Sequence, residues 1–356
     1  MVLDLRNKFE KIFAEADIKI NGKRPWDIKV NNPRFFRRVA LSGIIGLGDS
    51  YVDGDWDCDD LPEFIHKALK NNIHLKMKWT WVNIREVIKA KVFNLQSRPR
   101  AFMVGKEHYD IGNDLYQLML DKRMTYTCGY WKNAKNLEEA QEAKLDLICK
   151  KLGLKKGDKV LDIGCGWGSF AKYAAEKYGA RVVGITVSKE QVELARKLCK
   201  GLPVEIRIQD YREVNEKFDH VVSIGMFEHV GYKNYRTFFK TVHKCLKDDG
   251  LFLLHTMGQR DSYPDFNHPD YHWVLKHIFP NGMIPSIKQI GKATEELFVM
   301  EDWHTFREDY DKTIMAWWNN FDKNWPKLRA KYGDRFYRMW RFYVTTPCPK
   351  GQGFYE

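Results

Sequence analysis

The sequence predicts an α/β protein: a doubly wound parallel sheet preceded by a small N-terminal α+β domain. Two patterns carry this prediction. Between residues 158 and 256, short apolar runs alternate with helical patterns, which is the order that gives a parallel sheet with right-handed crossovers. Between residues 18 and 66, glycine and aspartate instead separate short apolar runs, as in "SGIIGLGDSYVDGDWDCDDL". Such frequent turn-forming residues are typical of a small domain that contains both helices and strands.

Each element of the sheet follows from its own run of residues. The expected strands are "KVLDIG", "ARVVGIT", "PVEIRI", "DHVVSIG" and "GLFLLHT". Helices of the type "SFAKYAAEKYG" and "SKEQVELARKLCKGL" lie between them. In such sheets ligands bind beyond the carboxyl ends of the strands. The residues that directly follow each run are therefore the first candidates for function.

Length and composition exclude several classes of protein. A chain of 356 residues suggests two domains with a proper core. Its 7 cysteines are scattered singly, so the sequence predicts neither a disulfide framework nor a metal site, and a reducing cytosol fits best. The N-terminal segment "MVLDLRNKFEKIFAEADIKI" is typical of an amphipathic helix and not of a signal peptide. No apolar stretch is long enough to span a membrane, so we expect a soluble protein.

The net charge of +12 is concentrated in one stretch. From Lys67 to Lys106, which we call the basic segment, ten Lys or Arg residues face one acid, Glu86. Tryptophan, valine and isoleucine are interleaved with them, as in an interfacial amphipathic segment. Anionic lipid would attract such a segment, and so would RNA. A solvated helix face beside a linker is the alternative.

A glycine-rich loop follows the first strand of the sheet. In "DIGCGWGSF", Gly164, Gly166 and Gly168 precede a helix start. Glycines there permit a tight turn and a close approach of a ligand to backbone N–H groups. By itself such a loop fits a dinucleotide site or a plain turn. The sequence "VLDIGCGWG" resembles motif I of class I methyltransferases. This resemblance implies a Rossmann-like fold of that class and S-adenosylmethionine as the cofactor.

The next two strand ends supply further cofactor candidates. Many such enzymes place an acid after the second strand for the ribose hydroxyls, but "VVGITVSKEQ" offers Thr186 and then Gln191. Ser188 and Gln191 also fit a helix capping box, and capping and ribose contact could coexist. After the third strand, Asp210 and Tyr211 are placed to cover the adenine, with a surface turn as the alternative. We further assign four residues to this pocket: Tyr126, Thr127, Val187 and Ile224.

Three reactive side chains lie at or near strand ends. Cys128 precedes the sheet in "TYTCGYW", Glu228 follows the fourth strand in "SIGMFEHVG", and His255 ends the fifth in "LLHTMG". Singly, each has a structural explanation as a buried thiol, a helix-terminal glutamate or a satisfied histidine. Jointly, at the ligand end of one sheet, they predict a reaction site.

A family resemblance rests on motifs that occur in one order along the chain. They are "EHYDIGNDLYQLMLDKRMTYTCGYW", "VLDIGCGWG", "VVGITVSKEQ", "SIGMFEHVG", "LHTMG", "KHIFPNGMIPS" and "DYDKTIMAWW". In this order they resemble cyclopropane-fatty-acyl-phospholipid synthases and the related mycolic acid cyclopropane synthases, over about residues 100 to 345. The N-terminal "LGDSYVDGDWDCDDL" is similar to the extra domain of the bacterial phospholipid enzymes. We therefore expect a lipid-binding domain at 1–85, a basic linker at 86–100 and a catalytic domain at 101–356.

The resemblance implies a reaction. The family adds a methylene group from S-adenosylmethionine across a cis double bond of a phospholipid acyl chain. An alkene is a poor nucleophile, so the methyl donor must be held in line while water is kept away. Attack leaves a carbocation, and a base must then take a proton so that the ring closes.

The resemblance also implies that a bound bicarbonate is the base. It would be held by Cys128, Glu228, His255 and Tyr310, and by the backbone at Gly225 and Met257. In this interpretation Cys128 is an anion-site residue at the start of a helix and not a nucleophile. Because Glu228 and bicarbonate are both anions, we expect the bicarbonate O–H to be donated to Glu228.

Aromatic faces could stabilise the carbocation. The candidates are Phe227, Tyr271, Trp273, Trp317 and Trp318, although aromatics at helical spacing are more often plain core. One departure from the family lies at the C-terminus. Relatives usually continue after "YVTTPC" into one more outer strand, so we expect that strand to be missing here.

Three rival functions share some of these features. A nucleic-acid methyltransferase would explain the glycine loop and the positive charge, but "GMFEH" lacks the turn that grips a flipped amino base. A family member that methylates the acyl chain without closing a ring needs the same residues. A non-catalytic lipid-binding protein would have lost motif residues, and none is visibly lost. We therefore expect a homodimer in the cytoplasm, peripherally bound to the membrane through anionic phospholipid, with no nucleic-acid partner.

Overall fold

The computed structural model describes residues 2–76, 112–260, 262, 272–279 and 282–345. The chain forms two compact units. The smaller unit contains the described residues of Met1–Phe93, Pro264–Ile278 and Tyr310–Phe354, and the larger one those of Asn94–Tyr263 and Phe279–Asp309.

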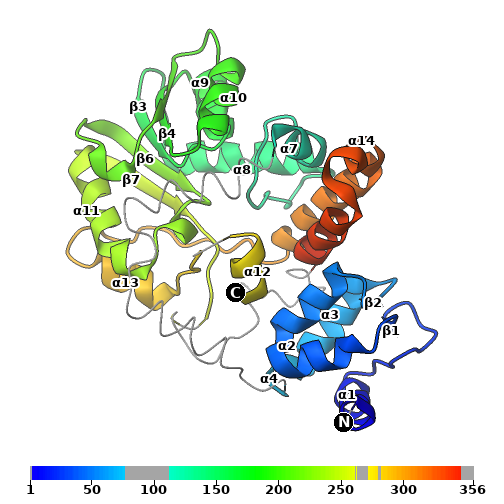
Figure 1. Ribbon diagram of the computed structural model, residues 1–356. Helices are drawn as coiled ribbons and strands as arrows, with labels where there is room; N and C mark the ends of the chain where they lie inside the picture. Colours follow the sequence, from blue (N-terminus) through cyan, green and yellow to red (C-terminus); the bar gives the residue numbers. More distant parts are fainter. Residues whose placement is uncertain (1, 77–111, 261, 263–271, 280–281, 346–356) are drawn as a thin grey trace. The chain divides into compact units, whose positions relative to one another are not determined.

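The larger unit is built on a parallel sheet of five strands in the order β5-β4-β3-β6-β7 (Figure 1). Its strands are β3 (Lys159–Ile163), β4 (Arg181–Thr186), β5 (Val204–Ile208), β6 (Phe218–Ile224) and β7 (Leu246–His255). They coincide with the five runs that the sequence analysis assigned to strands. The order of the strands reverses between β3 and β6, and in open parallel sheets ligands bind at that switch point. The predicted α/β class is confirmed.

Helices cover both faces of this sheet. They are α8 (Leu137–Lys151), α9 (Ser169–Tyr178), α10 (Lys189–Leu198), α11 (Tyr235–Cys245) and α13 (Ile287–Thr294). Helix α7 (Asn113–Met119) precedes them in the chain. Three short 3₁₀ turns accompany them: η2 (Tyr211–Glu213), η3 (Phe227–His229) and η4 (Tyr232–Asn234).

The two faces of the sheet are packed by alternate residues of the same strands. Val160 and Val182 belong to the core that contains Phe170 of α9. Their neighbours Leu161 and Val183 belong to the opposite core, which contains Phe238 and Phe239 of α11. This follows from the period of two along a strand. Because both faces are buried at the centre of the sheet, β3 and β4 are mostly apolar, whereas the edge strand β5 alternates apolar and charged residues.

The smaller unit combines helices with one antiparallel pair of strands. Its elements are α1 (Val2–Ala14), β1 (Lys29–Val30), α2 (Arg34–Val52), β2 (Trp56–Asp57), α3 (Leu61–Lys70), α4 (Ile73–Lys76), α12 (His272–His277) and α14 (Asp309–Thr345, its first residue grouped with the larger unit). Helix α14 bends at Gly333, where φ is 75°. Arg338 of α14 donates to the carbonyl oxygens of Tyr51 at 2.7 Å and Trp56 at 2.8 Å.

The C-terminal helix therefore completes the core formed by the N-terminal residues. The expected division at 1–85, 86–100 and 101–356 follows the chain, whereas the contacts group its two ends together. The linker itself lies outside the described residues, so that division stays a prediction.

Two expectations, the interfacial basic segment and the missing outer strand at the C-terminus, concern parts of the chain that the structure does not describe or describes only in part. Most of the basic segment and the residues after 345 lie outside the described ranges. Within those ranges, no helix combines the length and apolar character needed to cross a bilayer.

Candidate active site

The glycine loop forms the floor of a pocket at the carboxyl end of β3. Gly164, Gly166 and Gly168 all have positive φ, at 82°, 55° and 84°. At Gly164 a Cβ atom would lie 2.4 Å from Cγ of Met226, so the position requires glycine for space as well as for its backbone conformation. The backbone N–H groups of Gly164 and Cys165 both donate to the carbonyl of Ile185 in β4. The loop is thereby tied to the neighbouring strand.

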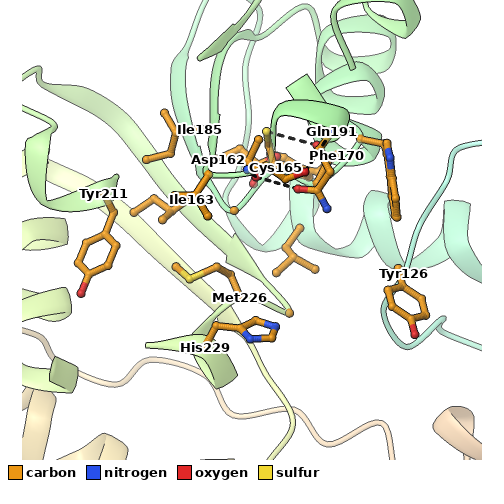
Figure 2. A pocket seen from close by; sticks show the side chains of 18 of the residues that line it. Tyr126, Asp162, Ile163, Cys165, Phe170, Ile185, Gln191, Tyr211, Met226 and His229 are labelled. Atoms are coloured by element: carbon orange, nitrogen blue, oxygen red, sulfur yellow. Dashed lines mark hydrogen bonds between the residues drawn. The ribbon is translucent and has the colours of Figure 1, made fainter. Parts of the chain in front are cut away.

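The pocket above this loop encloses about 150 Å³ (Figure 2). It brings together all but one of the predicted cofactor residues: Tyr126, Thr127, Gly164, Gly166, Thr186, Val187, Gln191, Asp210, Tyr211 and Ile224. The exception, Gly168, caps α9 and faces Cys199. The cofactor role of each residue stays a prediction.

Asp162 is a pocket residue that the sequence analysis missed. Its side chain is 1% exposed, and neither carboxylate oxygen has a hydrogen-bond partner among the described residues. Burial raises its pKa to about 7, and the positive charge of Lys144 partly opposes this. A buried acceptor without a partner is costly. The ammonium of an amino-acid ligand would supply the missing donor, so this carboxylate fits the methionine part of S-adenosylmethionine.

The sequence did contain a signal for Asp162. It is the one acid inside the apolar run "KVLDIG", directly before the glycine loop. An acid inside a strand buried on both faces is retained at a cost, which favours a functional role.

Trp167, Met226 and His229 form other walls of the pocket together with the predicted Tyr126, and these three were also missed. Trp167 donates its indole N–H to Oδ1 of Asn113 at 2.8 Å, and its ring lies 4.8 Å from that of Tyr116. Figure 2 shows Met226 and His229 projecting from the segment after β6, and Tyr126 across the cavity from them. Burial lowers the pKa of His229 to about 4, so its imidazole is neutral at neutral pH. These walls limit the access of water.

Gln191 is held by two interactions. Ser188 accepts a hydrogen bond from the backbone N–H of Gln191, as in a helix cap. The Gln191 side-chain oxygen accepts from the hydroxyl of Thr186 at 2.7 Å. The helix cap is therefore present, but the Gln191 side-chain oxygen bonds Thr186 and not the backbone N–H of Ser188, as it would in a full capping box. The amide of Gln191 is fixed on the pocket wall. This geometry is compatible with both roles that the sequence suggested for Gln191, helix capping and contact with the ribose.

Asp210 and Tyr211 shape the pocket edge beyond β5. Asp210 accepts from the backbone N–H of Arg212 at 2.9 Å and so begins η2. The Tyr211 ring packs edge-on against Phe238 at 5.2 Å. Its hydroxyl is buried and has no hydrogen-bond partner within the described parts of the chain.

Glu228 and His255 lie at the ends of adjacent strands, β6 and β7. The backbone N–H of Met257 donates to Oε1 of Glu228 at 2.7 Å, and the N–H of Gly225 donates to the carbonyl of His255 at 2.8 Å. Both N–H groups thus already have acceptors, and the carbonyl of Met257 accepts from the hydroxyl of Thr256. This geometry does not fit the expectation that the backbone at Gly225 and Met257 donates to a bound anion.

Both side chains have atoms available to a ligand. Oε2 of Glu228 and Nδ1 of His255 are buried and have no hydrogen-bond partner among the residues that the structure describes. Burial raises the pKa of Glu228. Burial and the charge of Lys144 lower the pKa of His255 to about 3, so its imidazole is neutral.

Cys128 is buried, with its thiol 3.3 Å from the carbonyl oxygen of Gly129. The expectation that it begins a helix is wrong. It lies in a loop, and α8 begins only at Leu137, because Asn136 accepts from the N–H of Glu139 and caps the helix there. Tyr310 belongs to the smaller unit, and its place in the site stays a prediction.

The aromatic candidates for stabilising a cation lie mostly in apolar cores. Phe227 is fully buried and stacks on Tyr235 with ring centroids 4.4 Å apart. Trp273 and Trp317 are buried in the smaller unit. Trp318 packs against Phe321 there, and Tyr271 lies outside the described residues.

The strand order, the glycine loop at the switch point and the buried carboxylate beside it define a class I S-adenosylmethionine-dependent methyltransferase. Among solved structures, the chain is similar to the cyclopropane synthase MmaA2 from Mycobacterium tuberculosis, with 30% identity and a TM-score of 0.65 over 68% of this chain and 91% of that one. It is also similar to mycolic acid cyclopropane synthase CmaA1 complexed with S-adenosylhomocysteine (SAH), with 31% identity and a TM-score of 0.64 over 70% and 92%.

Sequence comparisons agree with the structural ones. The family described as mycolic acid cyclopropane synthetase matches residues 96–351. Cyclopropane-fatty-acyl-phospholipid synthase of Escherichia coli is 51% identical over 94% of this chain and 87% of its own length. A probable fatty acid methyltransferase of Pseudomonas putida is 38% identical over 67% of this chain and 63% of its own. The chain therefore belongs to the mycolic acid cyclopropane synthetase family, as the order of its motifs predicted.

The charge state of Asp162 leads to a prediction for cofactor binding. Because its pKa is raised to about 7, the carboxylate is largely protonated below that pH and can no longer pair with an ammonium. The affinity for SAH, measured by calorimetry, should therefore fall several-fold from about pH 8 to about pH 6.

Replacing Asp162 by Asn should weaken SAH binding at the higher pH and remove this part of the pH dependence. Glu193, which is exposed in α10, provides a control variant, Glu193→Gln. Equal pH profiles for the wild type and Asp162→Asn would contradict the assignment.

Proposed function

We propose that this chain transfers a methylene group from S-adenosylmethionine to the cis double bond of an unsaturated acyl chain in a membrane phospholipid. The observation that carries the proposal is the 51% identity, over 94% of this chain, to a cyclopropane-fatty-acyl-phospholipid synthase. The fold and the pocket support it, because the predicted cofactor residues line one cavity at the carboxyl edge of the sheet.

The cofactor supplies an electrophilic methyl group when it is bound. Asp162 would hold its ammonium, Gln191 and Thr186 its ribose, and Asp210 its adenine. Apolar and aromatic walls, including Trp167 and Met226, would exclude water from the reacting atoms. Exclusion of water matters because the acyl chain passes through a carbocation that water would capture.

We further propose bicarbonate as the base that takes the proton after methyl transfer. Glu228 and His255 support this, because each has a buried ligand atom without a partner among the described residues. Neutral His255 carries one ring N–H, which would be donated to the anion. The bicarbonate O–H would be donated to Glu228, which orients the remaining oxygens toward the substrate. Cys128 and Tyr310 would complete the anion site.

The same residues would also serve methyl transfer without ring closure. This second candidate is favoured by the similarity to relatives that are named as lipid methyltransferases. They include the probable fatty acid methyltransferase of Pseudomonas putida and a sphingolipid C9-methyltransferase of Gibberella zeae, which is 33% identical over 83% of this chain. The two candidates differ only in the fate of the carbocation.

The lipid product distinguishes the candidates. We expect phospholipids from cells that express the protein to gain the mass of one methylene group and to lose the double bond. Mass spectrometry combined with an alkene-specific reaction checks both. A gain of mass with the alkene retained would instead mean a methylated chain.

A matched variant shows that the product depends on the reaction site. Glu228→Gln should lose most of the ring product and respond less to added bicarbonate. Full activity with unchanged bicarbonate dependence in this variant would contradict the proposed base.

We propose that the protein acts as a homodimer at the inner face of the cytoplasmic membrane. The homodimer is proposed from the family resemblance alone. The basic segment supports the membrane location through its charge, since each basic residue near an anionic surface contributes roughly 1 kcal/mol. That interaction is screened by salt.

Binding to vesicles that contain anionic phospholipid should therefore weaken as salt is added. A sedimentation assay with anionic and neutral vesicles measures it. Reversing the charges between residues 76 and 91 should reduce binding, whereas unchanged binding would mean that this stretch is only a solvated surface.

A further inference from the structure

Lys144 of α8 is a buried cation that the proposed reaction does not yet use. Its side chain has no exposed surface, and within the described residues no other Lys or Arg is buried. Its ammonium donates to the hydroxyl of Thr127 at 2.7 Å. Among the residues that the structure describes, this is the one hydrogen bond it makes, so further N–H groups remain for a ligand. Burying an ammonium is costly unless it is paired.

The same face of α8 fixes the loop that leads to Cys128. Gln141, one turn before Lys144, donates to the carbonyl of Thr127 at 2.7 Å. At the other end of the loop, Asp121 accepts from the N–H of Thr125 at 2.8 Å. Thr127 lies close against Gly225, where an added Cβ would come within 2.3 Å of its methyl group. Lys144 and Gln141 thus hold one wall of the pocket against the end of β6.

The charge of Lys144 acts on the groups around it. The acidic groups that face it are Asp121, Asp162 and Cys128, and all three favour its protonated form. Burial lowers its pKa to about 8 against this attraction, so at neutral pH it is largely charged. Its positive charge also reaches His255, whose pKa it helps to lower. The cation therefore acts on Asp162 of the cofactor pocket and on His255 of the proposed anion site, while its hydrogen bond fixes it at Thr127, the residue before Cys128.

We propose that Lys144 is a positioning residue of the reaction: its ammonium holds the loop at Thr127 and supplies the positive charge that lets an anion bind beside Glu228. The inference rests on the proposed function and deepens it. Two anions close together in an apolar site repel one another strongly. A fixed cation next to Cys128 and His255 offsets that repulsion without contacting the acyl chain.

Substitutions of Thr127 and Lys144 can distinguish a purely structural role of Lys144 from a role that depends on its positive charge. In the structural case only the hydrogen bond to Thr127 matters, and Thr127→Val should act like a change of Lys144. If the charge matters, the two changes differ, because Thr127→Val removes the hydrogen bond and keeps the cation.

The experiment compares Lys144→Met with Thr127→Val in buffers with controlled bicarbonate. Lys144→Gln is a second neutral variant that retains donor groups. Two quantities are measured: the dependence of the rate on bicarbonate, as kcat and KM, and the line broadening of carbon-13 bicarbonate in NMR spectra of the resting protein. Circular dichroism and the thermal unfolding midpoint show that each variant remains folded, because SAH affinity itself should change when Lys144 or Thr127 of the pocket is altered.

We expect Lys144→Met and Lys144→Gln to raise the KM for bicarbonate by roughly tenfold or more, as for the loss of a nearby unit charge in a partly screened interior. In both variants the broadening of the bicarbonate signal should decrease. Thr127→Val should change this KM by less than about threefold, because it removes one hydrogen bond of the ammonium but keeps the charge beside the anion site, and should act mainly on kcat.

Two results would overturn the inference: an unchanged KM for bicarbonate in both Lys144 variants, or equal changes in these variants and in Thr127→Val. The dependence of the wild-type rate on bicarbonate concentration shows whether the role of Lys144 alone is wrong or the proposed base is wrong as well. A wild-type rate that does not respond to bicarbonate would remove the proposed base and, with it, the role of Lys144.

Discussion

The site depends on two opposite charges that are buried beside one cavity. The carboxylate of Asp162 and the ammonium of Lys144 are both almost fully enclosed, and each is stabilised by the charge of the other. Neither oxygen of Asp162 has a hydrogen-bond partner among the described residues. Burial of this acceptor without a hydrogen-bond partner costs free energy, and a cationic ligand that pairs with Asp162 would offset that cost. Affinity for an ammonium follows from this arrangement.

The parallel sheet holds Asp162 in place. Strand β3 is paired on both sides, and Asp162 stands in register with Gly184 of β4 and Val222 of β6. A strand held on both edges cannot slip, because a shift of one residue would exchange its two faces. The glycine loop then turns away at once and opens the space above the carboxylate. On the other side, α8 brings Lys144 up beneath the loop that carries Thr127 and Cys128.

Much of this arrangement could be predicted from the sequence. All five strands and the glycine loop follow from local patterns, because their signal lies in neighbouring residues. The candidate residues after the strands follow from topology, since parallel strands end at one edge. Lys144 was harder to recognise, because in a charged helix such as "LEEAQEAKLDLICKK" a lysine suggests an exposed position. It nevertheless occupies, with Gln141, the same face as the buried Leu137, Leu145 and Ile148, and that spacing was a usable signal.

Other features depend on contacts between distant residues. The contact of Arg338 with Tyr51 joins the two ends of the chain, and no local pattern indicates it. The position of Cys128 was predicted wrongly because the cap at Asn136 delays the next helix.

A crystal structure of the protein with SAH would show directly whether Asp162 binds the ammonium of the ligand. We expect that ammonium to lie within hydrogen-bond distance of Asp162, with the ribose near Gln191. A ligand whose ammonium is held elsewhere, with Asp162 still unpaired or turned toward solvent, would contradict this expectation.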